Sequence, residues 1–159
     1  MSLAGLPLLT PRPAAALDLL EDTPVLHLTG RVRPAGPHGV AFDMPMLARM
    51  PQTSFEARTP WYPTARKFTG PLLRDVLSAA GAQGTLVRAM ALNDYRVDIP
   101  FEDTQRFDML LARLLDDKPM PVRDKGPLFI IYPFDQRTEL RNALYYSRCA
   151  WQLKAIEVQ

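Results

Sequence analysis

FTGPLLRDVLSAAGA, residues 68–82, predicts the clearest helix in the sequence. Pro71 suits the first helical position, where a backbone N–H would have no partner inside the helix. Gly81 suits the end of the helix, because the left-handed backbone that closes many helices costs glycine little. The apolar residues between them fall on one helical face, which predicts that the helix packs on a core: Leu72, Leu73, Val76 and Leu77.

Segments typical of short strands surround this helix on both sides. Residues 23–32, 52–58 and 151–158 alternate apolar and polar positions, and residues 128–135 form a β-branched and aromatic run. Residues 85–103 predict two strands joined by a polar turn. Residues 107–127 could form a helix, but the DDKP turn favours strand–turn–strand. Shorter helices are expected after Asp43, which suits an N-cap, and within residues 137–148. We therefore expect one compact α+β domain, mostly β, over residues 24–159.

Composition excludes several functional classes. Hydrophobic residues make up 47% of the chain, too many for a disordered protein. The net charge is only +2 and Lys and Arg are scattered, which argues against a nucleic-acid partner. No run of eighteen apolar residues is present, so no direct insertion into a membrane is expected. With Cys149, His27 and His38 as the only cysteine and histidines, a zinc site built from Cys and His is excluded.

Residues 1–23 form a loose N-terminal segment in our interpretation. MSLAGLPLLTPRP lacks both a basic start and a continuous apolar run, so it is not an intact signal peptide. MSL before a Pro-rich stretch is consistent with an artificial start on a chain whose signal sequence has been removed.

Five segments, in the right order over roughly residues 24–158, carry a family resemblance. They are FTGPLLRDVLSAAGA, NDYRVDIP, FDMLLARLLDDKPMP, DKGPLFIIYP and AWQLKAIEV. Together they resemble the sulfite-oxidase, or molybdopterin-oxidoreductase, fold. In the enzymes of this family a cysteine thiolate binds molybdenum about a dozen residues before the glycine that corresponds to Gly70.

The chain departs from those enzymes at two positions of the cofactor site. Arg58 and Thr59 stand near the place of the metal-binding cysteine, and neither can replace a thiolate. Ala150 stands where the family has a lysine that holds the charged end of the cofactor. The sequence looks more like the metal-free, periplasmic pterin-binding members of the PruR type. That resemblance implies a secreted protein that binds a reduced pterin without metal.

Trp61 is the main candidate for pterin binding. A pterin ring is flat and aromatic, and Trp61 lies in a loop stiffened by Pro60 and Pro63. The alternative is a tryptophan that packs in the core. Arg58 and Thr59 are expected to point into the same cleft and to bond the edge of the ring, although Arg58 also suits an exposed strand end.

Further candidate ligand residues lie in three later segments. Asp94 is placed to pair with the N–H groups of the pterin ring, or else belongs to an ordinary hairpin turn. Tyr132 either lines the cleft or packs in the core. The complete set of candidates from these segments is Asn93, Asp94, Tyr95, Tyr132, Ser147 and Arg148, of which the last two would bond a hydroxylated pterin side chain.

Three functions remain open from the sequence. The leading hypothesis is a non-catalytic module that relays a pterin signal to the periplasmic domain of a membrane-anchored regulator of cyclic-di-GMP. The alternatives are a molybdopterin-dependent oxidoreductase of the sulfite-oxidase type and a scaffold with a vestigial pocket. We also expect the loop 58–67 and the turn 123–126 to frame the mouth of the cleft.

Overall fold

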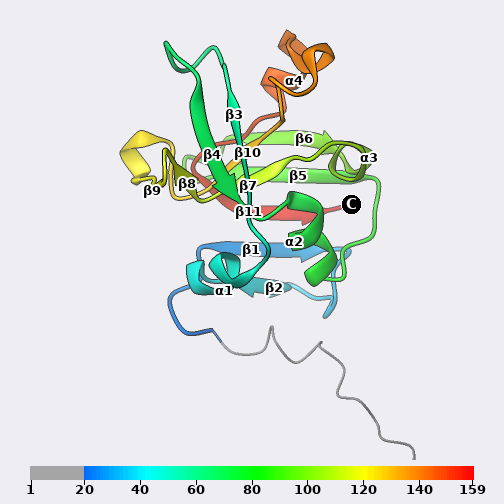
Figure 1. Cartoon of the computed structure of the whole chain (residues 1–159). Coiled ribbons are helices and arrows are strands. Elements are labelled where there is room, and N and C mark those ends of the chain that lie inside the picture. Colours follow the sequence, from blue (N-terminus) through cyan, green and yellow to red (C-terminus); the bar gives the residue numbers. More distant parts are fainter. Residues whose placement is uncertain (1–19) are drawn as a thin grey trace, which may run out of the picture.

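The largest of the three β-sheets contains both the first and the last strand of the domain. A computed structural model describes residues 20–159, and its largest sheet has the strand order β2-β1-β11-β5-β6 (Figure 1). The strands β1 and β11 pair in parallel although one opens and the other closes the domain, and the remaining pairs are antiparallel. Their bounds are β1 Leu26–Gly30, β2 Val40–Phe42, β5 Leu86–Ala91, β6 Arg96–Pro100 and β11 Leu153–Val158.

Two smaller sheets carry the loops that surround the candidate site. A four-stranded sheet has the order β3-β4-β8-β9, and a two-stranded sheet pairs β7 with β10. The pair β3–β4 rises as a hairpin beside the last helix (Figure 1). Their bounds are β3 Thr53–Ala57, β4 Arg66–Gly70, β7 Leu110–Ala112, β8 Leu114–Leu115, β9 Lys118–Pro119 and β10 Phe129–Ile131.

The helices are short and mostly lie where the sequence predicts them. Asp43 caps α1 as expected, since its side chain accepts a hydrogen bond from the Met46 N–H. The helix α2 begins at Leu73 and not at the predicted Pro71, because Leu72 still has extended backbone. The helix α3 was not predicted. The helical bounds are α1 Met44–Arg49, α2 Leu73–Ala79, α3 Phe101–Arg106, η2 Val122–Asp124, η3 Thr138–Leu140 and α4 Ala143–Ser147.

A single core lies between the sheets and α2. The strand β5 alternates buried and half-buried positions, as a strand with one core face should. The helix α2 contributes Leu73, Val76 and Leu77, so the predicted apolar face is the buried one. The predicted mostly-β α+β architecture is therefore confirmed. Most of the segment 1–23 lies outside the described residues, and within residues 20–159 no helix is long and apolar enough to cross a membrane.

Candidate functional site

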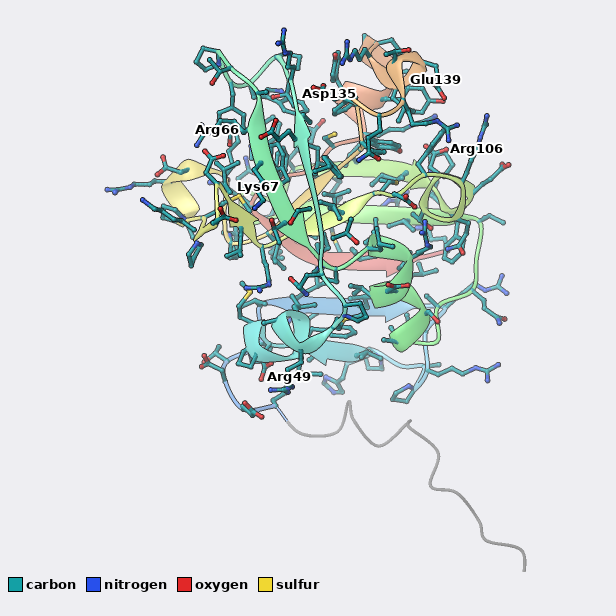
Figure 2. The ribbon with its side chains drawn as sticks, in the orientation of Figure 1. Arg49, Arg66, Lys67, Arg106, Asp135 and Glu139 are labelled. Carbon is teal, nitrogen blue, oxygen red and sulfur yellow. The ribbon has the colours of Figure 1, made fainter. Side chains whose placement is uncertain are left out.

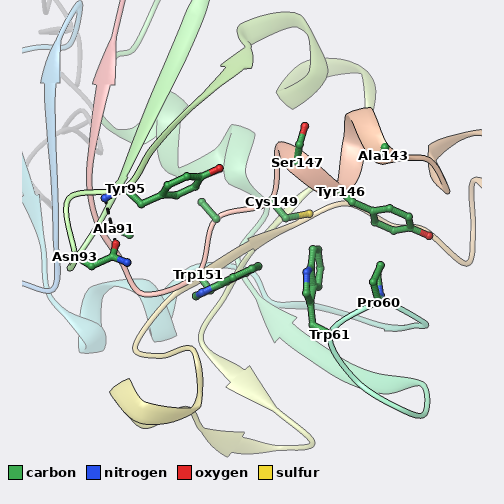
Figure 3. A pocket seen from close by; sticks show the side chains of 11 residues that line it. Pro60, Trp61, Ala91, Asn93, Tyr95, Ala143, Tyr146, Ser147, Cys149 and Trp151 are labelled. Atoms are coloured by element: carbon green, nitrogen blue, oxygen red, sulfur yellow. Dashed lines mark hydrogen bonds between the residues drawn. The ribbon is translucent and has the colours of Figure 1, made fainter.

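An aromatic cleft of about 590 Å³ opens between the β3–β4 loop, the β5–β6 turn and α4 (Figure 3). The last helix and the segment that leads into β11 form its inner wall. None of the lining side chains is charged at neutral pH. The lining residues are Pro60, Trp61, Ala91, Asn93, Tyr95, Ala143, Tyr146, Ser147, Cys149, Ala150 and Trp151.

Trp61 both lines the cleft and packs on the core. Its ring meets Trp151 edge-on at a centroid distance of 5.3 Å and Tyr146 at 6.0 Å. It also packs edge-on against the fully buried Phe129 at 5.7 Å. One position of Trp61 therefore suits both hypotheses, because the same ring can line the cleft and pack on the core. Three aromatic neighbours fix the ring before any ligand arrives.

Few polar groups face the cleft, and their bonding limits what they can offer a ligand. The Asn93 Oδ1 accepts a hydrogen bond from the Tyr95 N–H at 3.1 Å, which leaves the Asn93 side-chain N–H groups without a partner among residues 20–159. The Ser147 hydroxyl donates to the Leu144 carbonyl at 2.6 Å. Tyr95 is 58% exposed. The cleft therefore presents donors and acceptors of neutral side chains beside aromatic faces.

Cys149 is the one thiol in the lining, and burial raises its pKa from about 9 to about 12. The protonated Sγ contacts the Tyr145 carbonyl at 3.7 Å. A protonated thiol is a poor nucleophile and a poor metal ligand. In the folded protein the one thiol of the cleft is therefore neutral.

We predict that the Cys149 thiol resists alkylation at pH 8 in the folded protein and reacts once the protein is unfolded. Because folding raises its pKa, burial of the neutral thiol stabilises the fold fully below pH 9, and this contribution is lost as pH rises through about 12. Mass spectrometry after iodoacetamide treatment, with and without urea, measures this. Rapid labelling of folded protein would contradict it.

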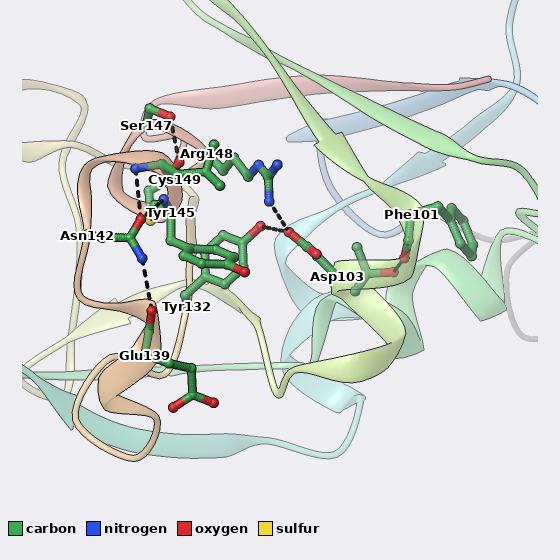
Figure 4. Close-up of polar contacts among 11 residues, drawn as sticks. Phe101, Asp103, Tyr132, Glu139, Asn142, Tyr145, Ser147, Arg148 and Cys149 are labelled. Carbon is green, nitrogen blue, oxygen red and sulfur yellow. Dashed lines mark hydrogen bonds and ion pairs between the residues drawn. The ribbon is translucent and has the colours of Figure 1, made fainter.

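A buried ionic network holds the inner wall of the cleft in place (Figure 4). The Asp103 Oδ2 accepts a hydrogen bond from the Tyr132 hydroxyl at 2.6 Å and another from the Arg148 Nη1 at 2.9 Å. Burial, helped by Asp103, raises the pKa of Tyr132 far above its usual range, so the hydroxyl remains a donor. Arg148 directly follows Ser147, so the network ties the end of α4 to α3.

The structure brings four of the nine predicted ligand residues together on the cleft. They come from two loops and one helix end: Trp61, Asn93, Tyr95 and Ser147. Three others lie elsewhere. Tyr132 is fully buried in the core, and Arg148 is engaged with Asp103. Asp94 pairs with Lys154 at 2.5 Å, which lowers the pKa of Asp94, and its side chain is mostly exposed.

The expectation that Arg58 and Thr59 share the cleft with Trp61 is corrected. Both line a separate hollow of about 300 Å³ inside the β3–β4 loop, together with Tyr62. The Arg58 N–H donates to Asp135, which fixes the backbone there. Thr59 Oγ1 is buried and has no hydrogen-bond partner within residues 20–159.

The predicted frame of the cleft mouth also needs a correction. The turn 123–126 contributes Arg123, Asp124 and Lys125 to a separate groove that Tyr62 also lines. None of these residues lines the cleft. Sequence reasoning in turn missed Tyr146 and Trp151 as cleft residues. Their aromatic character was the only available signal, and it does not separate a cleft wall from a core.

One solved structure places this architecture among known folds. The crystal structure of the sulfane dehydrogenase SoxCD from Paracoccus pantotrophus matches the chain with a TM-score of 0.62 and 16% sequence identity. This chain has a sulfite-oxidase-like fold. The match covers 90% of this chain and 40% of the SoxCD chain, so the chain spans less than half the length of that structure. No family model and no curated protein sequence matches it.

Proposed function

We propose that this sulfite-oxidase-like domain binds a reduced, metal-free pterin in the aromatic cleft and does not catalyse a reaction. The observation that carries the proposal is the composition of the cleft, which is aromatic, concave and free of ionised side chains. A pterin ring needs flat apolar faces for stacking and a few neutral groups for its edge. Trp61, Trp151 and Tyr95 supply the faces, and Asn93 supplies free amide N–H groups.

The same composition disfavours a molybdenum cofactor. A metal of this type is bound by a thiolate, and the residues near the place of the metal-binding cysteine are Arg58 and Thr59, which have no thiol. The phosphorylated tail of the molybdenum cofactor requires a cation. In this chain Ala150 occupies the part of the cleft wall where the family has a lysine. Molybdenum analysis of purified protein tests this point directly. Stoichiometric metal would replace the proposal with a molybdopterin-dependent oxidoreductase.

We further propose that the domain acts in the periplasm. There it would relay the presence of pterin to the periplasmic domain of a membrane-anchored protein that controls cyclic-di-GMP turnover. This part rests on the resemblance of the sequence to the metal-free members of the fold. A ligand can carry such a signal only if the partner distinguishes loaded from empty protein. A pull-down of the partner domain by pterin-loaded and by empty protein tests the relay. Equal amounts of captured partner would contradict signalling and leave only pterin binding.

Tyr95→Ala is expected to weaken pterin binding roughly two- to tenfold, the loss of about 0.5–1.5 kcal/mol of aromatic stacking. Because Tyr95 is 58% exposed, thermal stability should stay near that of the unaltered protein. Calorimetric titration with tetrahydrobiopterin measures the affinity. Trp61 and Trp151 are the only tryptophans and both line the cleft, so fluorescence quenching gives a second readout.

Leu92→Ala is the matched control for this experiment. Leu92 is an exposed residue of the same turn that does not line the cleft, so its removal should leave the affinity unchanged. Equal affinities for the Tyr95 variant and the unaltered protein would place the pterin elsewhere. Trp61→Ala is a poorer test, because the loss of three aromatic contacts would also lower stability.

A further inference from the structure

A basic groove of about 420 Å³ lies beside the cleft, between β4, the β8–β9 hairpin and the turn that follows it. Figure 2 shows Arg66 at the edge of β4 on this side of the molecule. Four cationic side chains and one carboxylate line the groove, although the sequence scatters these charges over sixty positions. The charged lining residues are Arg66, Lys118, Arg123, Lys125 and Asp124.

Two of the four cations, Lys118 and Lys125, have no ion pair within residues 20–159. Arg123 reaches Asp124 only at 3.7 Å, and its side chain is 87% exposed. Arg66 does pair with Asp116 at 2.5 Å through one nitrogen. Exposed pairs of this kind hold their partners weakly, so the groove keeps a net positive field.

The groove also has an aromatic and apolar lining. The Arg66 guanidinium lies 4.7 Å from the centre of the Tyr62 ring, and the Lys125 ammonium lies 5.7 Å from the same ring. The hairpin side contributes Leu115, Pro119, Met120 and Pro121. Val122, next to this lining, is 52% exposed. A site for a small oxyanion would instead need several N–H donors that converge on one point.

The turn that carries Arg123 and Lys125 is fixed to the rest of the domain. The Gln152 side chain donates to the Val122 carbonyl at 2.7 Å, and the Gln152 N–H donates to the Lys125 carbonyl at 3.0 Å. Lys125 has a left-handed backbone with φ of 74°, and its ammonium lies 4.9 Å from the centre of the Trp151 ring. A partner would therefore meet a preformed surface and would lose little free energy in ordering it.

We propose that this basic groove is the docking surface for an acidic segment of a partner protein. Carboxylates of the segment would lie against Lys118, Arg123 and Lys125, and its apolar side chains would lie against Tyr62 and the proline-rich hairpin. Tyr and Arg are enriched at protein interfaces, and a positive patch of this kind is complementary to a negatively charged partner. The inference deepens the relay part of the proposed function, because it names the chemistry of the partner. Pterin binding in the cleft does not depend on it.

The test uses a fluorescently labelled peptide of glutamate, proline and leucine residues as the probe, with binding followed by anisotropy. Lys118→Glu combined with Arg123→Glu should weaken peptide binding roughly tenfold. The matched control, Arg31→Glu combined with Arg49→Glu, makes the same change in net charge at exposed residues that do not line the groove, and should weaken binding less than twofold. Figure 2 shows Arg49 on α1, apart from the groove.

Three results would overturn the proposal. Equal losses in the two double variants would show an effect of net charge alone. If the groove variant binds the peptide as tightly as the unaltered protein, the peptide binds elsewhere. Tighter groove-dependent binding of a single-stranded oligonucleotide of the same charge would assign the groove to nucleic acid. Titration with tetrahydrobiopterin keeps the two proposals apart. The groove variant should bind pterin with unchanged affinity, whatever it does to peptide binding. If the cleft proposal is wrong, the unaltered protein itself will not bind pterin.

Discussion

Asp103→Ala is expected to lower the free energy of unfolding by about 3 kcal/mol or more. Asp103 is only 8% exposed, and its Oδ2 is shared by Tyr132 and Arg148. Removing the carboxylate leaves a fully buried hydroxyl and a largely buried guanidinium without their partner. Leaving one member of such a pair unpaired costs more than the pair contributes, since the desolvation of the remaining group is no longer offset.

Urea unfolding measures this loss, and Tyr132→Phe provides the comparison. The phenylalanine variant removes one hydrogen bond and keeps the ion pair, so it should cost only about 1 kcal/mol. Asp103→Ala should in addition loosen the inner wall of the cleft and reduce pterin affinity, because Arg148 adjoins Ser147. A loss below that of Tyr132→Phe would show that the network does not support the fold.

Gly70→Ala should destabilise the fold by about 3 kcal/mol through steric overlap. A Cβ at Gly70 would lie 2.1 Å from the Leu111 carbonyl oxygen and 2.9 Å from the Ala112 Cα. Both are backbone atoms of β7, so they cannot turn aside as a side chain could. This close approach is the physical reason for a glycine at the position that the family motif marks before the helix.

Gly36→Ala is the control for Gly70→Ala. Its Cβ would meet no atom within 4 Å, but its φ is +136°, so only backbone strain remains, at about 1 kcal/mol. Thermal and urea unfolding of both variants should therefore rank Gly70→Ala as clearly the more damaging. Similar losses in the two variants would mean that β4 and β7 separate easily.

Local patterns in the sequence predicted most elements of the fold. The N-cap at Asp43, the apolar face of α2 and the turn at residues 116–117 are each decided by a few neighbouring residues, and each is confirmed. The helix α3 was missed because its six residues are too few to show helical periodicity and follow a strand ending in Pro100. The parallel pairing of β1 with β11 cannot be read from either segment alone.

The candidate site was only partly predictable because its geometry depends on distant partners. Asp94 was expected at the ligand, but Lys154, sixty positions later, binds its carboxylate. Arg148 was expected at the cleft, but Asp103, forty-five positions earlier, holds its guanidinium. A short polar motif shows which side chains are available and not which ones the fold has already engaged. Trp61 and Tyr95 do line the cleft, and their role as ligand contacts stays a prediction.

The inner wall of the cleft is fixed on both sides, and this has a kinetic consequence. Arg148 is held by Asp103, and Ala150 exchanges two backbone hydrogen bonds with Ile130, at 2.7 and 3.2 Å. A ligand that enters does not have to wait for this wall to fold around it. Association should therefore proceed at the rate at which the two molecules meet in the right orientation, and substitutions in the lining should act mainly on how long the ligand stays bound. In the proposed relay, residence time would then decide, more than the rate of capture, how long a signal lasts after the ligand disappears from the surroundings.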